Sequence, residues 1–250
     1  MNIIGIVQLK NEKENIKALL EQARVMSDGI IIVDDNSTDN TFTPEILNDP
    51  IILEYVKLPE KEMFEGINLS VLINLARKHG ATWCYNPMGH YRYRGNINDF
   101  KEQIKLLDSE GITHVNLRWF TMWNSNQYRV DGKYDVSKRW HCNIFKLQPD
   151  TWFKVEKSHC VHPESNIEVH YFMSDIFEVN YGRNDKVKRQ KKFDLYNKVG
   201  DGKETFDHYL DKDVVLVDYD KKKMSELVYK YNENINIHLR FKGKYFVLLK

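Results

Sequence analysis

The sequence predicts an α/β fold: a mostly parallel, Rossmann-like central sheet flanked by helices, with a smaller antiparallel portion and a C-terminal extension. Short apolar runs that suit buried strands alternate with segments whose apolar residues recur at helical spacing. Glycines close several of the short links between these segments. With 250 residues, 42% of them hydrophobic, the chain can form one large domain with a sizeable core.

Strands and helices alternate over roughly the first 120 residues, which is the pattern of a parallel sheet with crossover helices. A further short helix is expected near Asp39. The predicted strands cover residues 3–7, 30–33, 51–56, 81–85 and 113–120, and the predicted helices centre on residues 16–26, 69–76 and 100–107.

The pattern changes after Trp123, where short strands alternate with turns and indicate an antiparallel portion. A basic segment that follows is expected to be helical, and a Gly-containing stretch is expected to link it to the C-terminal part. The predicted strands are 141–147, 167–173, 214–219 and 245–250, the helices 182–199 and 221–231, and the linker 200–204.

The bulk composition argues against several classes of protein. The 37 basic residues nearly balance the 36 acidic ones, which argues against a dedicated nucleic-acid binder. No apolar run approaches the ~18 residues of a spanning helix, and the N-terminus does not resemble a signal peptide. Three widely spaced cysteines suit reduced thiols in a cytoplasmic protein. Neither a GxGxxG motif after the first strand nor a GxxxxGK[ST] loop is present, which argues against a dehydrogenase or NTPase.

The second predicted strand ends on two adjacent carboxylates, Asp34 and Asp35. Ligands of open α/β sheets bind at the carboxyl ends of the strands. A carboxylate there can accept charge-assisted hydrogen bonds from a ribose hydroxyl or a base N–H. The residue types alone leave a second interpretation open, in which both residues only form the turn and Asp39 caps the next helix.

The segments "GIVQLKNEKENI" and "IIIVDDNSTDNT" resemble the opening of family-2 inverting glycosyltransferases, which have the GT-A nucleotide-sugar-binding fold. The resemblance continues through the helix before "HGATW" and "QYRVDGKYDVSKRWHCNIFKL", and more weakly through "NYGRNDKVKRQKKFDLYNKVG". It implies a GT-A-like domain over 1–199, with a nucleotide-binding half (1–120) and an acceptor half (121–199), followed by an extension (200–250). It also implies inverting transfer of a sugar from a nucleotide-linked donor, expected to be uridine-linked, to a glycan or lipid-linked acceptor.

The resemblance also assigns roles in nucleotide binding. Asp35 would contact the base or ribose, Gln8 and Lys10 would form walls around the base, and Asn11 and Asp34 would shape the pocket. From the residue types alone, Asn11 could equally cap the first helix, since Glu14 three residues later completes a capping box. Lys10 could equally be a solvated surface lysine.

Members of that family end the fourth strand with Asp-x-Asp, whose carboxylates hold a divalent metal on the donor diphosphate. Aligned on "GATW", the two positions fall on Met88 and His90, around Gly89. No Asp or Glu occurs between residues 81 and 98. A family His before Tyr-Gly appears here as Asn180. Two features that the resemblance links to the metal are therefore altered together.

Three explanations stay open. In a metal-independent transferase, basic groups would stabilise the leaving diphosphate. Arg92 and Arg94 lie beside Gly89 and His90, and Arg183, Lys186, Lys188 and Arg189 lie further along the chain. In an altered metal site, His90, with Asn180 as a weak second ligand, would bind an ion such as Mn, so Mn or Mg remains open as a cofactor. The third is a catalytically silent relative that binds a nucleotide or sugar. The "YRYR" alternation also fits a half-exposed strand.

An inverting transferase needs a general base for the acceptor hydroxyl. Glu164, in the His-rich loop "HCVHPESN", is the first candidate. Asp131 is the second, although Gly132 after it favours a hairpin turn instead. The basic helix around 186–192 could contact an anionic membrane surface, where lipid-linked acceptors reside, or could simply present a solvated face.

Overall fold

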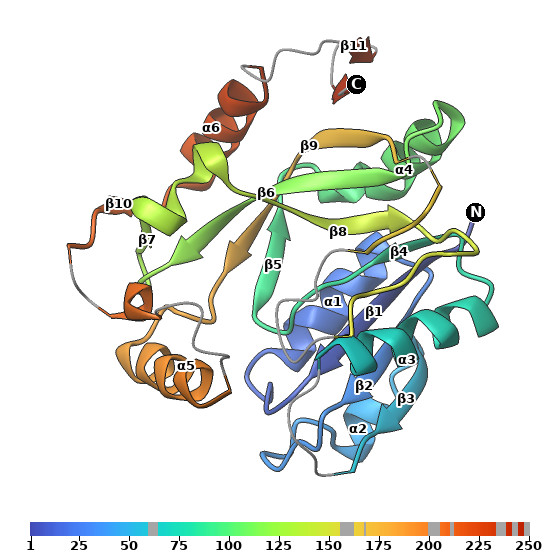
Figure 1. Cartoon of the computed structure of the whole chain (residues 1–250), viewed down its shortest axis with the longest axis horizontal. Coiled ribbons are helices and arrows are strands. Elements are labelled where there is room, and N and C mark those ends of the chain that lie inside the picture. The colour runs from blue at the N-terminus through green and yellow to red at the C-terminus, as the bar shows by residue number, and fades with distance from the viewer. Residues whose placement is uncertain are drawn as a thin grey trace.

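The computed structural model describes residues 1–59, 65–155, 163–167, 169–199, 206–210, 213–233, 239–241 and 245–247. Strands and helices alternate through the N-terminal half, as predicted (Figure 1). This half contains β1 (Ile3–Leu9), α1 (Ile16–Met26), β2 (Gly29–Asp34), α2 (Pro44–Leu47), β3 (Ile52–Lys57), α3 (Glu65–Lys78), β4 (Trp83–Tyr85), β5 (Tyr91–Arg94), α4 (Phe100–Ser109) and β6 (His114–Met122). The remainder contains β7 (Gln127–Arg129), β8 (Trp140–Lys146), β9 (Tyr171–Asn180), α5 (Lys186–Val199), β10 (Leu216–Asp218), α6 (Lys221–Glu233), β11 (Leu239–Phe241) and β12 (Tyr245–Val247).

One large sheet connects both halves, in the order β11-β12-β9-β6-β8-β4-β1-β2-β3. The edge formed by β4, β1, β2 and β3 is parallel throughout. Antiparallel pairing begins where β8 meets β4 and continues between β8 and β6, whereas β9 runs parallel to β6. The predicted α/β fold, with a parallel part and a smaller antiparallel part, is confirmed.

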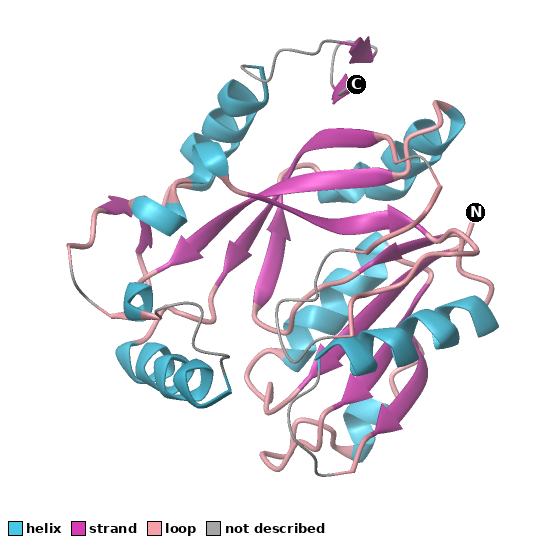
Figure 2. Cartoon of the chain, viewed as in Figure 1, coloured by secondary structure: helices cyan, strands magenta, loops and turns pink. Residues whose placement is uncertain are grey.

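Helices cover both faces of the parallel strands (Figure 2). The inner strands β1, β2 and β4 are mostly apolar because both of their faces are buried, and every residue of β2 is inaccessible to solvent or nearly so. On one face β1 packs against α1 and α4, and on the other β1 and β2 pack against α3. The strongly amphipathic spacing of α1 explains why its bounds agree with the prediction, since Ile16, Leu19, Leu20, Ala23 and Met26 are all buried.

Several predicted elements need correction. The short helix begins at Pro44, with Thr43 rather than Asp39 at its N-cap, where the Thr43 hydroxyl accepts a bond from the N–H of Ile46. The strand predicted over 167–173 begins at Tyr171 and continues to Asn180, because β5 and β6 both pair with its second half. The linker predicted over 200–204 lies outside the described residues.

The described segments after residue 200 pack against β6, β7 and β9. Strand β10 pairs with β7, and Met224 and Val228 of α6 are buried against Phe120 and Phe177. The buried Arg118 guanidinium of β6 donates to the side-chain oxygen of Asn232 at 2.9 Å and to backbone carbonyls on α6 and on residues 136–137. None of the helices in the described ranges is long and apolar enough to cross a membrane.

Candidate nucleotide site

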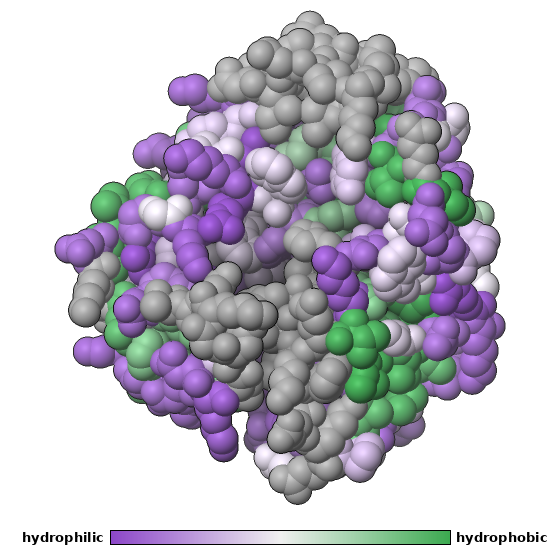
Figure 3. All heavy atoms as spheres, viewed as in Figure 1, coloured by the Kyte–Doolittle hydropathy of each residue, from purple (hydrophilic) through white to green (hydrophobic). Residues whose placement is uncertain are grey.

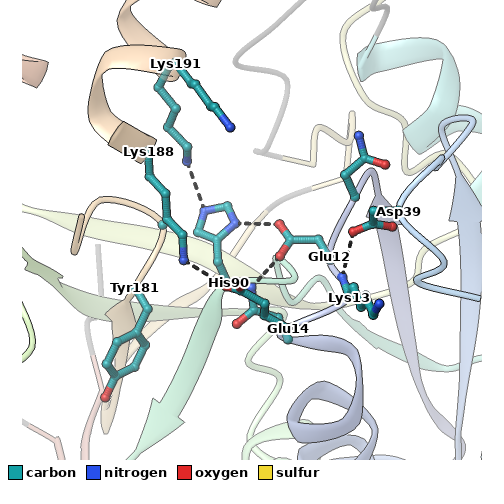
Figure 4. Close-up of a pocket in the computed structure, with 12 residues that line it drawn as sticks. Glu12, Lys13, Glu14, Asp39, His90, Tyr181, Lys188 and Lys191 are labelled. Carbon is teal, nitrogen blue, oxygen red and sulfur yellow. Dashed lines mark hydrogen bonds and ion pairs between the residues drawn. The ribbon is translucent and has the colours of Figure 1, made fainter. Parts of the chain in front are cut away.

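The carboxyl ends of β1, β2 and β4 meet at one edge of the sheet, because the three strands are parallel neighbours. The loops that follow them lie beside α5 (Figure 1), whose Lys188, Lys191 and Lys192 face them. A hollow of about 550 Å³ opens between these loops and α5 (Figure 4). Its lining consists of Asn11, Glu12, Lys13, Glu14, Asn15, Asp39, His90, Tyr181, Gly182, Lys188, Lys191 and Lys192.

The two adjacent aspartates at the end of β2 have different environments. Both oxygens of Asp34 accept protein hydrogen bonds, one from the N–H of Ser37 at 2.7 Å and one from the hydroxyl of Tyr55 at 2.8 Å. The carboxylate of Asp35 has only the ammonium of Lys10, at 3.7 Å, as a partner within the described residues. Asp34 therefore braces the turn, while Asp35 keeps acceptor capacity that no described side chain other than Lys10 uses.

Gln8 supplies a second acceptor that no described residue uses, near the same end of the sheet. It is the last residue but one of β1, and its side-chain carbonyl oxygen is buried without a hydrogen-bond partner. Its backbone is in register with Val33, two residues before Asp35. Because buried polar atoms normally have a partner, an unpartnered acceptor at a strand end suits a ligand donor.

Polar side chains after β2 hold the loop after β1. The backbone N–H groups of three consecutive residues, Asn11, Glu12 and Lys13, donate to Ser37 Oγ, Thr41 Oγ1 and Asp39 Oδ2 respectively. In return, the side-chain oxygen of Asn11 accepts from the N–H of Thr38. This exchange fixes the direction of the loop.

Asn11 does not cap the first helix, which corrects the capping-box interpretation. Helix α1 begins at Ile16, with Asn15 in the cap position, and Asn11 has a positive φ of 55°. Asparagine tolerates this left-handed conformation better than most residues because its short polar side chain bonds locally. Asn11 therefore bends the loop toward the hollow.

Three side chains from distant parts of the sequence form a hydrogen-bonded chain across the hollow. Glu12 Oε1 lies 3.1 Å from His90 Nδ1, and His90 Nε2 lies 3.3 Å from Lys192 Nζ. Asn15 donates to the other Glu12 oxygen at 2.6 Å. A carboxylate accepts only, so the Nδ1 that faces Glu12 carries the proton and Nε2 accepts from the Lys192 ammonium.

The surroundings of this hydrogen-bonded chain shift the pKa values of all three of its side chains. Burial, supported by the charge of Lys192, lowers the pKa of His90 to about 4 and keeps the ring neutral. Burial and the nearby Arg183 lower the pKa of Lys192 to about 7. Burial acts to raise the pKa of Glu12, but its hydrogen bonds with His90 and Asn15 and the charge of Lys192 outweigh that effect and lower it.

Glycines allow His90 to sit this close to its neighbours. A Cβ added to Gly182 would lie 2.3 Å from Cδ2 of the His90 ring, and one added to Gly89 would lie 2.7 Å from Cγ of Glu12. The side-chain oxygen of Asn180 accepts from the N–H of Gly182 at 2.8 Å, and the N–H of Tyr181 donates to the carbonyl of His90. The positions aligned with Asp-x-Asp and with the family His are therefore neighbours in space.

The residues at this position do not fit a metal ion. Both ring nitrogens of His90 already have protein partners, and Asn180 uses its oxygen in a turn. The one carboxylate that contacts them among the described residues, Glu12, is itself bonded to His90 and Asn15, whereas Mg or Mn needs several hard oxygen ligands. Nowhere in the described ranges do three His, Cys, Asp or Glu side chains gather in a way that could hold a metal ion.

Arg92 and Arg94 point away from their aromatic neighbours, as the half-exposed strand interpretation requires. Tyr91 and Tyr93 of β5 are buried, and the arginines between and after them are partly exposed. The Arg92 guanidinium donates to the carbonyl of Gly89 at 2.8 Å and to the side chain of Asn15 at 3.0 Å. This side chain therefore ties the loop before β5 to the start of α1, and neither arginine lines the hollow.

The two candidate bases are also outside the lining of the hollow. Asp131 accepts from Arg129 and from the N–H of Val215. Burial acts to raise its pKa, but these bonds outweigh that effect and lower it. Glu164 forms a backbone bridge with Trp152, and its carboxylate lies 3.1 Å from the ammonium of Lys154.

Sequence reasoning missed Glu12 and Lys192 in the hollow and a third group, Glu178, in the core. Glu178 of β9 is fully buried and accepts from Asn143 Nδ2 at 2.6 Å, with His141 Nδ1 at 3.0 Å. An acid inside the apolar run "IFEVN" was a usable signal for it. Lys192 had a weaker signal, its spacing of four from Lys188 on one helix face.

Solved structures of glycosyltransferases resemble this fold at low sequence identity. One is a structure of residues 1–349 of S. aureus TarS in complex with UDP-GlcNAc. The alignment covers 94% of this chain and 73% of the TarS chain, at 12% identity and a TM-score of 0.49. The same TarS fragment with UDP aligns with 59% of this chain at 16% identity and a TM-score of 0.43. This chain spans about half (47%) of that structure.

A further likeness is to the mannosyltransferase PcManGT of Pyrobaculum calidifontis, in complex with GDP-Man and Mn²⁺. It aligns with 58% of this chain and 44% of its own length, at 18% identity and a TM-score of 0.38. No protein-family model matches the sequence, and no curated protein matches it significantly. Identities and scores this low assign neither a family nor an activity to the chain.

Proposed function

We propose that this protein binds a nucleotide-activated sugar, uridine-linked, and transfers the sugar with inversion to a glycan or lipid-linked acceptor. The observation that carries the proposal is the contrast between Asp34, whose oxygens are both occupied, and Asp35, which keeps its capacity to accept. Asp35 would receive hydrogen bonds from the base or ribose, with Gln8 and Lys10 beside it.

The transfer would proceed as a single displacement. The acceptor hydroxyl oxygen forms a bond to the anomeric carbon, and the bond from that carbon to the phosphate oxygen breaks. The electron pair leaves with the nucleoside diphosphate, and a general base takes the hydroxyl proton. Basic side chains around the hollow, rather than a metal ion, would stabilise the charge on the leaving diphosphate.

Glu164 remains our first candidate for the base and Asp131 the second. The ion pair of Glu164 with Lys154 joins two partly exposed side chains, which an arriving acceptor can separate at small cost. Asp131 is bound more firmly, by Arg129 and Val215. We therefore expect E164Q to abolish turnover while D131N mainly lowers stability. Normal turnover in E164Q would rule Glu164 out.

Calorimetric titration with UDP tests the nucleotide site. The wild type should bind UDP in EDTA as well as in Mn²⁺, and D35A should lose binding in both. D194A, which removes an exposed carboxylate on α5, serves as the control and should bind normally. Binding that requires Mn²⁺ would contradict the metal-independent form, and unchanged binding in D35A would place the nucleotide elsewhere.

A catalytically silent nucleotide- or sugar-binding relative is the second candidate. It is favoured by one observation: each carboxylate in the described lining of the hollow already has a protein partner. Glu12 is bonded to His90, Glu14 lies 3.1 Å from the ammonium of Lys188, and Asp39 accepts from Lys13 and Thr41. UDP binding without donor hydrolysis or transfer, over a panel of uridine-linked sugars, would support this candidate.

Contact of α5 with an anionic membrane surface is a weaker proposal. Three basic residues of this helix are used internally, because Arg189 donates to the carbonyls of Trp123 and Arg183, Lys188 pairs with Glu14, and Lys192 contacts His90. On the face drawn in Figure 3, the area where α5 lies is mainly hydrophilic or grey, while a hydrophobic area lies near α3. Sedimentation with anionic liposomes should therefore bring down little protein, and strong pelleting would favour the membrane role.

A further inference from the structure

We propose that the ammonium group of Lys192, held in place by His90 and Glu12, is the cation that binds the diphosphate of the donor. The inference rests on the proposed function, because it names the group that contacts the diphosphate in the same site. It assigns to one lysine of α5 the place that a metal ion takes in the family that the sequence resembles.

The position of Lys192 supports this assignment. Its Nζ lies 3.3 Å from Nε2 of His90, at the end of the loop that follows β4. That loop lies at the carboxyl edge of the sheet, where phosphates of nucleotides bind in open α/β folds. Lys192 reaches this edge from α5, which Asp185 caps at its start and Arg189 anchors to the carbonyl of Trp123.

His90 holds the ammonium without neutralising it. The ring donates from Nδ1 to Glu12 and accepts at Nε2, so the group that accepts from Lys192 is uncharged. The Glu12 carboxylate is bonded to the far side of the ring and to Asn15. Since an ammonium has three N–H donors and His90 uses one, two remain for phosphate oxygens, and no other described residue takes them.

The surroundings of Lys192 favour an anion of this kind. Lys13, Lys188 and Lys191 line the same hollow, and Arg183 is close enough to lower the pKa of Lys192. The volume of about 550 Å³ lies within the range of about 300–1,000 Å³ that small-molecule sites occupy. In Figure 4 Lys188 and Lys191 extend from α5 on one side of His90, and Glu12 and Lys13 lie on its other side.

The decisive experiment compares UDP with uridine in EDTA on three proteins: the wild type, K192M and K198M. K198M is the matched control, since it removes the same charge from the same helix outside the lining of the hollow. K192M should bind UDP about 10- to 100-fold more weakly, the effect of losing one charge-assisted hydrogen bond, and uridine normally. K198M should bind both normally, and K192R should regain much of the UDP affinity. Thermal melting of each variant shows that it is folded; if K192M is not, K192Q replaces it.

The outcomes separate the two proposals. If wild type and K192M bind UDP equally well, Lys192 does not contact the diphosphate, although the proposed function stands. If UDP and uridine affinities fall together in K192M, the lysine acts on the whole site rather than on the diphosphate, and the inference fails. If the wild type binds neither UDP nor uridine, the uridine-linked function fails and this inference with it.

Discussion

The imidazole ring of His90 lies directly against Gly182, where an added Cβ would come within 2.3 Å of the ring carbon Cδ2. A real Cβ never approaches this closely, and Gly182 has no positive φ that would strain an alanine for other reasons. Replacing Gly182 therefore tests the position of His90 in isolation from backbone effects.

We expect G182A to lower the free energy of unfolding by about 1–3 kcal/mol, because the His90 ring must move. Chemical denaturation measures this cost. In an H90A background, which removes the ring, the same substitution should cost less than about 0.5 kcal/mol. An equal cost in both backgrounds would show that another neighbour opposes the methyl group.

Glu12 and Lys192 should act on UDP binding as one unit, because His90 joins them. E12Q removes the carboxylate that sets the orientation of the ring, so we expect UDP affinity to fall roughly fivefold or more. The double variant E12Q/K192M should bind little worse than K192M alone, since residues in one hydrogen-bonded network are not additive. D194N, which removes an exposed carboxylate outside the lining of the hollow, is the control. Additive losses in the double variant would contradict the network.

Asp34 should matter for stability more than for binding. D34A removes the acceptor for both Ser37 and Tyr55, so we expect a loss of about 2–4 kcal/mol in the free energy of unfolding. Y55F removes one of these bonds and should cost about 1 kcal/mol. Denaturation with urea compares the two. If D34A is no more destabilising than Y55F, the bond to Ser37 contributes nothing.

Arg118 should hold the C-terminal helix on the sheet. Its guanidinium is buried and donates to Asn232, to the carbonyl of Tyr231 and to two carbonyls of residues 136–137. R118M leaves these acceptors without a donor, so we expect a loss of roughly 3 kcal/mol and faster proteolysis within α6. K138M, an exposed change nearby, should stay within about 0.5 kcal/mol of the wild type. Unchanged proteolysis in R118M would show that the apolar contacts of α6 suffice.

Stability should rise with pH between about 4 and 6.5. Burial lowers the pKa of His114 from 6.5 to about 4, so over this window the unfolded chain binds a proton that the folded chain does not. The free energy of unfolding therefore increases by up to about 1.4 kcal/mol per pH unit from this residue. H114F, whose ring suits the neighbouring Phe145 and Tyr171, should flatten the slope. An unchanged slope in H114F would mean that His114 is protonated in the folded state.

The periodicity of the sequence predicted the parallel half well and the later half less well. In α1 and β2 the apolar residues of the sequence are the residues that are buried in the fold. The bounds of both elements could therefore be predicted from the sequence. Strand β9 could not be delimited in this way, since its second half is defined by pairing with β5 and β6. Pairing between segments distant in sequence leaves little trace in local periodicity.

The sequence predicted the part of the candidate site that lies at the carboxyl ends of the parallel strands, because the strand order alone locates that edge. The ends of β1 and β2 could be located, and with them Asp34 and Asp35, but not the different use of the two carboxylates. That difference depends on Tyr55, which reaches Asp34 from β3. The hydrogen-bonded chain from Glu12 through His90 to Lys192 could not be predicted either. Glu12 and His90 are 78 residues apart in the sequence, and His90 and Lys192 are 102 residues apart.

The segment Asp-Asp-Asn-Ser-Thr-Asp has a structural role of its own. Its side chains form hydrogen bonds that join the loop after β2 to the loop after β1. Ser37 and Asp39, with Thr41 just beyond, use their side chains to hold the backbone of residues 11–13. Selection for a correctly folded loop would therefore preserve these residues in an active transferase and in a relative that has lost turnover. These side chains therefore report the architecture of the loop, and under the proposed function Asp35 is the residue of the segment that would differ between a chain that binds a nucleotide and one that does not.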